Sequence, residues 1–165
     1  MNLYMTFGTL SYLQKIVASH PHEQMLMLQN KLTTILLHET TGSTLFKEPI
    51  SYQVLKGTGN MHQFSSFVAF HYFSITEEAK PLFESRAEEY LLKHPSSNSA
   101  YRILRPIKHN PYLIITFWRQ ALDFESWNER HPLQEIQQTM AKKKLFTPAY
   151  STKTFSIIEG ISKEI

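Results

Sequence analysis

The sequence predicts an α+β fold in which an antiparallel sheet packs against helices on one of its faces. Two observations lead to this expectation. Segments rich in Phe, Tyr, Val and Ile with strand-like alternation occur before, between and after stretches with helical spacing. The composition, with 42% hydrophobic and 19% charged residues among 165, is typical of a globular chain with one core, or a core and a substantial appendage.

Residues 1–62 are expected to form a strand-rich part with a single helix. Thr9 is a suitable helix cap, and apolar residues then recur at helical spacing, at Leu10, Leu13, Ile16 and Val17. Strands are predicted at residues 2–7, 25–29, 32–38 and 50–55. The run Gly57-Thr58-Gly59-Asn60 favours a loop, which places the boundary between the two parts near residue 62.

Residues 63–165 are expected to form the second part, with the order β-α-β-β-α-β. Strands are predicted at residues 66–75, 100–105, 112–118 and 150–158. Helices are predicted at 81–91, at 121–129 and from 133 to about 143. This order is the ferredoxin-like arrangement, with the helices on one face of an antiparallel sheet. No internal repeat is detected in the sequence.

Charge and cysteine content exclude several kinds of function. The formal net charge of +3 is too small and too scattered to indicate a nucleic-acid partner, and the run Lys142-Lys143-Lys144 is interpreted as a solvated helix end. The absence of cysteine excludes disulfides, a thiolate nucleophile and Cys-ligated metal sites. Neither a signal peptide nor an apolar stretch of about 20 residues is found, so a soluble, cytoplasmic protein without a membrane partner is expected.

Several runs in the second part carry a resemblance to a known family. They are residues 101–106, 114–118 and 123–127, in which Trp127 follows Trp118 by nine residues, together with residues 75–84. These runs resemble the strands and helices of the IsdG-type haem-degrading monooxygenases, which belong to the antibiotic biosynthesis monooxygenase (ABM) superfamily of dimeric α+β barrels. Residues 4–9 and 38–42 resemble the long, two-part branch from Gram-positive bacteria. That branch contains HmoB-like haem monooxygenases and TRAP (target of RNAIII-activating protein), so the resemblance covers nearly the whole chain.

The resemblance implies three site positions. A Trp that presses on the porphyrin and ruffles it falls on Trp127, for which core packing one helical turn from Phe124 is the alternative. The family's Asn, on the distal side of the iron, falls on His71, and its iron-ligating His falls on Gln137. Arg86 and Tyr90 lie on the helix face expected to border the haem, where Arg86 could pair with a propionate or form an ordinary salt bridge.

The role of His71 stays open between three alternatives. It lies within a predicted strand among Phe and Ala, so it is either a neutral buried histidine with a structural role, a distal donor to bound O₂, or a ligand of the haem iron. Gln137 is a poor iron ligand that could border the pocket. His131 could replace it, although its place before Pro132 favours a helix cap or a surface position.

The resemblance implies a haem-degrading monooxygenase, in which haem is both cofactor and substrate and is opened with O₂ to release iron. Electrons would come from an external reductase or small reductant, because no flavin or nicotinamide motif is present. The alternative is a catalytically silent regulatory or binding protein of the TRAP type. The strand-rich first part could cover the open sheet face of the second. A monomer with an internal pseudo-barrel is therefore favoured over a homodimer.

Overall fold

The computed structural model describes residues 1–62, 65–95, 100–141 and 150–158. Its strands are β1 (Asn2–Phe7), β2 (Met25–Gln29), β3 (Thr34–Thr40), β4 (Ile50–Thr58), β5 (Phe67–Phe73), β6 (Ala100–Pro106), β7 (Tyr112–Trp118) and β8 (Tyr150–Ile157). Its helices are α1 (Leu10–Ser19), α2 (Lys80–Lys93), α3 (Ala121–Arg130) and α4 (Glu135–Ala141), with a short 3₁₀ helix at Glu77–Ala79. None of the helices in the described part of the chain has the length and apolarity that a membrane span requires.

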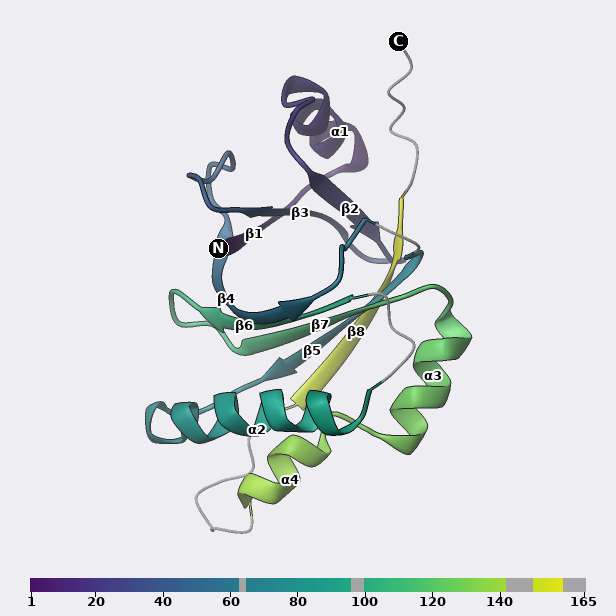
Figure 1. The fold of residues 1–165 in the computed structure, drawn as a ribbon. Coiled ribbons are helices and arrows are strands. Elements are labelled where there is room, and N and C mark those ends of the chain that lie inside the picture. Colours follow the sequence, from purple (N-terminus) through teal and green to yellow (C-terminus); the bar gives the residue numbers. More distant parts are fainter. Residues whose placement is uncertain (63–64, 96–99, 142–149, 159–165) are drawn as a thin grey trace.

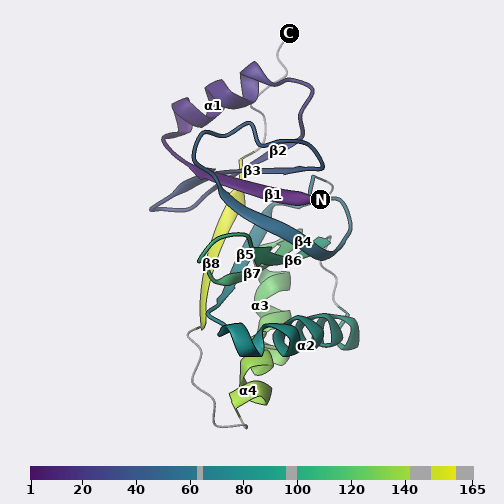
Figure 2. The same ribbon diagram turned by 90° about the vertical axis from the view of Figure 1, so that its left-hand side faces the viewer.

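The strands close into one antiparallel barrel with the order β1-β3-β2-β8-β5-β7-β6-β4. The C-terminal half, β5 to β8 with α2, α3 and α4, has the expected β-α-β-β-α-β order, so the ferredoxin-like prediction is confirmed. The helix α1 lies at one end of the molecule and α2, α3 and α4 lie toward the opposite end (Figures 1 and 2). The barrel predicted within a single chain is present, whereas the monomeric state stays a prediction.

The two halves share one strand order, which the sequence analysis did not detect. The N-terminal half, β1 to β4 with α1, is ordered β4-β1-β3-β2, and the C-terminal half is ordered β8-β5-β7-β6. Pairing of β2 with β8 and of β4 with β6 joins the halves at both edges. The halves therefore repeat one topology, although no repeat is detected in the sequence. The boundary near residue 62, which falls between the halves, stays a prediction.

Several strands differ from their predicted limits, and for β3 and β4 the structure shows the physical reason. β4 continues through Gly57 and Thr58, which pair with Arg102 and Tyr101 of β6, so the residues predicted as a loop are strand. β3 begins at Thr34 because the Asn30 side chain accepts hydrogen bonds from the backbone of residues 32 and 33, which forms a turn there. The described part of the last predicted helix is α4. The run at residues 142–144 lies outside the described residues.

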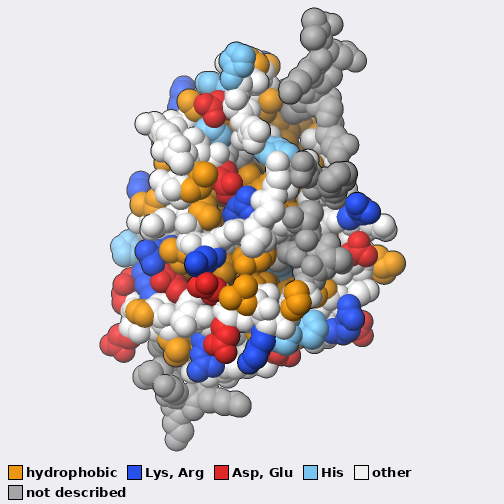
Figure 3. All heavy atoms as spheres, viewed as in Figure 1, with side chains coloured by type: hydrophobic (Ala, Val, Ile, Leu, Met, Phe, Trp, Pro, Cys, Tyr) orange, Lys and Arg blue, Asp and Glu red, His pale blue; other side chains and the backbone are white. Residues whose placement is uncertain are grey.

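Alternation along each strand separates the two sides of the barrel wall. Residues that point inward form the apolar barrel interior, which includes Leu3, Leu37, Phe70, Leu104 and Leu113. Residues that point outward from the C-terminal half form a second apolar cluster under α2, α3 and α4. On the face shown in Figure 3, acidic and basic side chains are intermixed over the part where α2 lies.

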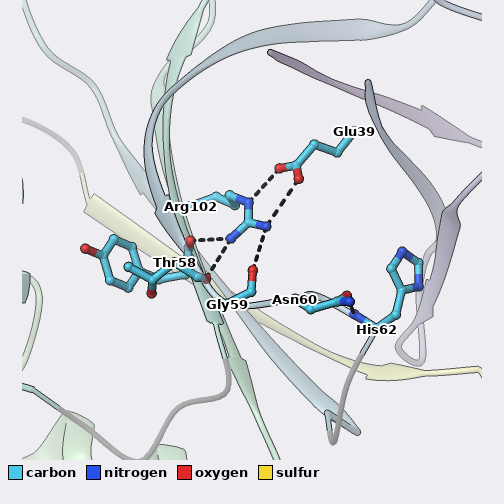
Figure 4. A network of polar contacts seen from close by, with 7 residues as sticks. Glu39, Thr58, Gly59, Asn60, His62 and Arg102 are labelled. Carbon is cyan, nitrogen blue, oxygen red and sulfur yellow. Dashed lines mark hydrogen bonds and ion pairs between the residues drawn. The ribbon is translucent and has the colours of Figure 1, made fainter. Parts of the chain in front are cut away.

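One charged pair joins the two halves inside one end of the barrel (Figure 4). Arg102 of β6 donates to Glu39 of β3 through Nε at 2.6 Å and Nη2 at 3.2 Å. Its other N–H groups donate to the carbonyl oxygens of Thr58, Tyr101 and Gly59, at 2.8, 2.8 and 3.0 Å. Every N–H of the guanidinium group is thereby paired, so Arg102 is a structural residue and has no donor left for a ligand.

Candidate functional site

Two of the predicted site residues lie in the same apolar layer, between the C-terminal sheet and its helices. His71 is on β5 and Trp127 is on α3, and two further aromatic residues connect them. The ring centroids of His71 and Phe124 are 5.8 Å apart, those of Phe124 and Trp118 are 5.7 Å apart, and those of Trp118 and Trp127 are 5.5 Å apart. The layer is therefore a continuous aromatic surface built from β5, β7 and α3.

Trp127 is held in this layer by its place on α3. Phe124 and Trp127 lie one turn apart, so both face the sheet, and Trp127 is only 3% exposed. Its Nε1 donates to the backbone carbonyl of His94, at the end of α2, at 3.3 Å. The side chain thus bridges two helices. A planar ligand that reached its ring would have to displace part of this packing.

His71 is fully buried and both of its ring nitrogens have partners. Nδ1 lies 3.0 Å from the hydroxyl oxygen of Tyr150, and Nε2 lies 3.3 Å from Oγ1 of Thr116. Burial lowers the pKa of the His71 imidazole to about 3, so the ring is neutral at pH 7. Neutral imidazole is the form that ligation requires. Ligation of iron would nevertheless break one of these two hydrogen bonds.

The two residues expected on α2 have different environments. The Tyr90 hydroxyl donates toward the Pro132 carbonyl oxygen at 3.1 Å and Oε2 of Glu135 at 3.2 Å, which ties α2 to α4. Burial and the neighbouring Glu135 carboxylate raise the pKa of Tyr90. Arg86 is exposed on the same helix. Its pairing with a propionate stays a prediction.

Gln137 and His131 follow Trp127 along the chain. Gln137 is on α4 and is 5% exposed. His131 is the C-cap residue of α3, as expected from its position before Pro132, and its backbone N–H donates to the Trp127 carbonyl oxygen at 2.7 Å. Its ring stacks on His94 with 4.3 Å between centroids.

Sequence reasoning missed three residues of this layer. His94 was not predicted as a site residue, but its ring lies against both His131 and Tyr90, with a centroid separation of 4.6 Å from Tyr90. Thr116 and Tyr150 were assigned only to strands, yet they supply the partners of His71. Alternation along β7 places Thr116 on the same face as Trp118, which is the signal that could have found it.

The side chains of the layer are of the kind that packs on flat apolar ligands rather than the kind that binds a free metal ion. Its aromatic rings can pack on a macrocycle, whereas no group of three His, Asp or Glu side chains that could hold a metal ion occurs in the described ranges. At the two positions where the resemblance places iron-facing groups, the structure has a hydrogen-bonded imidazole and an amide. The residue types suit the face of a macrocycle, but His71, Trp118 and Trp127 are at most 3% exposed, so their packing would have to open to admit one.

Comparison with known proteins identifies the family. The chain is 30% identical over 143 residues to a "Heme-degrading monooxygenase" of Listeria monocytogenes serovar 1/2a. The alignment covers 85% of this chain and 84% of the relative. The chain belongs to the IsdG-type family. It is also 30% identical over 123 residues to the "Signal transduction protein TRAP" of Staphylococcus epidermidis, covering 69% of each chain. No family model matches the chain.

Solved structures of similar proteins have the same fold. A structure described as a major regulator of staphylococcal pathogenesis superposes with a TM-score of 0.80 at 21% identity, covering 96% of this chain and 100% of the other. A ferredoxin-fold protein related to antibiotic biosynthesis monooxygenases, from Listeria monocytogenes 4b F2365, superposes with a TM-score of 0.75 at 27% identity, covering 96% and 94%. The predicted family and fold class are thereby confirmed.

Proposed function

We propose that this IsdG-type protein binds haem in the aromatic layer between β5 and α3 and opens the porphyrin ring oxidatively, releasing iron. The observation that carries the proposal is the contact series from His71 through Phe124 and Trp118 to Trp127. In this series, two predicted site residues from distant parts of the sequence lie in one buried layer. Similarity to a relative named for haem degradation supports the choice of substrate.

The residues of the layer would bind, orient and enclose the substrate. Trp127 would contact the porphyrin face, while Tyr90, Gln137 and the exposed Arg86 would border the ring. His71, neutral and buried, would act as a polar group on an otherwise apolar wall. Haem itself supplies the reactivity toward O₂, and an external reductant supplies the electrons. Because Trp127 is buried, binding would require α3 to move relative to the sheet.

Hemin titration of the purified protein tests the proposal. We expect a shift of the Soret band on binding and its decay after ascorbate is added under air. A Soret band that never shifts would refute haem binding. A shifted band that survives ascorbate for hours would refute degradation.

Substitution of Trp127 tests its role. Trp127→Ala would cost about 3–5 kcal/mol of stability because the side chain is buried, so Trp127→Phe is the better variant. We expect Trp127→Phe to bind hemin with near-normal affinity but degrade it at least about tenfold more slowly, because the loss is specific to the transition state. Tyr52→Phe, an aromatic substitution inside the barrel, is the matched control. Equal turnover by both variants would remove Trp127 from the site.

A second candidate function is a binding or regulatory role without catalysis, as in the relatives named TRAP. It is favoured by the amide of Gln137 at the family's ligand position and by the two hydrogen bonds of His71. The same titration separates the two functions, since this candidate predicts no oxidative loss of the Soret band. Hemin that binds and remains intact in the presence of reductant and air would support it.

A further inference from the structure

A series of side-chain hydrogen bonds passes through the candidate site from one strand to the next. Trp118 Nε1 donates to Thr116 Oγ1 at 2.8 Å, and Thr116 Oγ1 lies 3.3 Å from His71 Nε2. His71 Nδ1 lies 3.0 Å from the hydroxyl oxygen of Tyr150, which accepts a hydrogen bond from Thr152 at 2.7 Å. These side chains come from β7, β5 and β8, which are neighbours in the barrel.

The direction of the bond between Thr116 and His71 follows from burial. An indole N–H can only donate, so the Thr116 oxygen accepts from Trp118 and its own hydroxyl hydrogen still needs an acceptor. Thr116 is 1% exposed, so bulk water does not reach its hydroxyl group, and His71 Nε2 is the acceptor at hand. An unpaired buried donor is unfavourable, because it loses its hydrogen bond to water and gains none in the protein. Donation from Thr116 to His71 Nε2 avoids this cost.

The direction of the bond on the other side of the ring is then fixed. A neutral imidazole whose Nε2 accepts must carry its hydrogen on Nδ1, so Nδ1 donates to the Tyr150 oxygen. Tyr150 is half-buried and Thr152 is exposed, so the Tyr150 hydroxyl hydrogen can turn toward water. The opposite tautomer would leave the buried Thr116 hydrogen without an acceptor. Three bonds thus run in one direction, from Trp118 through Thr116 and His71 to the Tyr150 oxygen, which also accepts the bond from Thr152.

We propose that Thr116 is a positioning residue that holds His71 as the Nδ1–H tautomer and occupies the lone pair of Nε2. A histidine binds a metal through its unprotonated nitrogen, while the other nitrogen donates to a fixed acceptor. Tyr150 provides such an acceptor, but Thr116 takes the lone pair that iron would need. His71 is therefore kept off the iron while this bond is intact, a consequence that rests on the proposed function. Of the three roles considered for His71, this arrangement opposes two, iron ligation and donation to O₂, because Nε2 accepts from Thr116 and the Nδ1 hydrogen is donated to Tyr150.

The tautomer is tested directly by ¹⁵N NMR of the protein without hemin, prepared with ¹⁵N-labelled histidine. The His71 signals are assigned by their loss in His71→Asn. At pH 7 we expect Nε2 to give the shift of an unprotonated nitrogen and Nδ1 that of a protonated one. The reverse pattern, or two averaged shifts, would overturn the assignment.

Substitution of Thr116 tests the positioning role. Thr116→Val keeps the shape but removes the hydroxyl, so both His71 nitrogen shifts should move as the tautomers mix, whereas Thr116→Ser should retain the wild-type shifts. Because Thr116→Val leaves the Trp118 N–H unpaired in the core, the double variant Thr116→Val/Trp118→Phe removes both partners and guards against unfolding. Wild-type His71 shifts in a folded variant without the hydroxyl would refute the role of Thr116.

Hemin spectra of the same variants test the consequence for iron. Releasing Nε2 in Thr116→Val should change the Soret maximum of the bound hemin, whereas Thr116→Ser should match the wild type. Identical Soret maxima in all three proteins would show that Thr116 is not what keeps His71 off the iron. The proposed function and the positioning role of Thr116 are refuted by different results. Absence of hemin binding refutes the proposed function and leaves the NMR result standing, and a reversed tautomer refutes this inference whatever hemin does.

Discussion

The N-terminal and C-terminal halves have the same strand order but different coverings on their outer faces. In the C-terminal half, α3 and α4 connect the third strand to the fourth and complete the layer around Trp127. In the N-terminal half, residues 41–49 make this connection without a helix. There α1 and residues 45–48 border a groove of about 610 Å³. Strand pairing alone closes the barrel, whereas the covering elements decide whether a face is packed or hollow.

The barrel also buries two polar sites that are stabilised in different ways. A charged pair buried between the halves, Arg102 with Glu39, has an acceptor for every N–H of the guanidinium group. The candidate site in the C-terminal half instead buries a neutral histidine bonded to two hydroxyl groups. A buried polar group can thus be stabilised by pairing its charge or by losing it. Three substitutions test how far this contrast holds.

Breaking the charged pair should have the largest effect. Arg102→Met would leave the Glu39 carboxylate and three carbonyl oxygens without their donor, and the Arg102 side chain is only 9% exposed. We expect a loss of about 3–5 kcal/mol in the free energy of unfolding, measured with urea. Arg105→Met is the matched control, because Arg105 pairs with Glu84 but is 42% exposed. That variant should lose about 1 kcal/mol or less. Because Arg105 also donates to Gln53 of β4, both arginines join the halves, and equal losses would show that burial gives the pair of Arg102 and Glu39 no added role.

Acidification should have the next largest effect, through His71. Its pKa is about 3 in the folded state against 6.5 for the ordinary group, so the unfolded chain binds the extra proton between these values. The contribution to stability is therefore complete above pH 6.5 and is lost as the pH falls toward 3. Between pH 7 and pH 5, the wild type should lose about 2 kcal/mol more than His71→Asn, measured by urea unfolding. Parallel losses in the two proteins would contradict the neutral buried histidine.

Crowding the charged pair should have the smallest effect. A Cβ atom added at Gly57 would lie 2.7 Å from Cδ of Arg102, whose guanidinium group is fixed by its hydrogen bonds. Gly57→Ala should therefore cost about 1 kcal/mol, the low end of the range for overpacking. At Gly42 the nearest contact of an added Cβ is 3.4 Å, so Gly42→Ala is the control and should leave the unfolding midpoint nearly unchanged. Equal midpoints for the two variants would mean that the Arg102 side chain has room to shift.

Local features were predictable where the residues themselves supply the reason. Thr9 caps α1 through a bond from the Tyr12 backbone N–H at 3.2 Å, as its side chain and the spacing of the following apolar residues indicated. The end of β4 was not predictable in this way. Gly57 and Thr58 have the composition of a loop, and they are strand because β6 lies beside them. Their pairing comes from a part of the chain more than forty residues away.

The sequence by itself determined the order of the elements, the ferredoxin-like fold of the C-terminal half and the family. Periodicity and the spacing of Trp118 and Trp127 are local, so they can be detected without coordinates. Only the tertiary structure decided that β2 pairs with β8, that Arg102 meets Glu39, and that Thr116 and Tyr150 are the partners of His71. Alternation shows which face of a strand is buried. Which side chains meet there depends on register and strand order, set by the packing of the whole barrel.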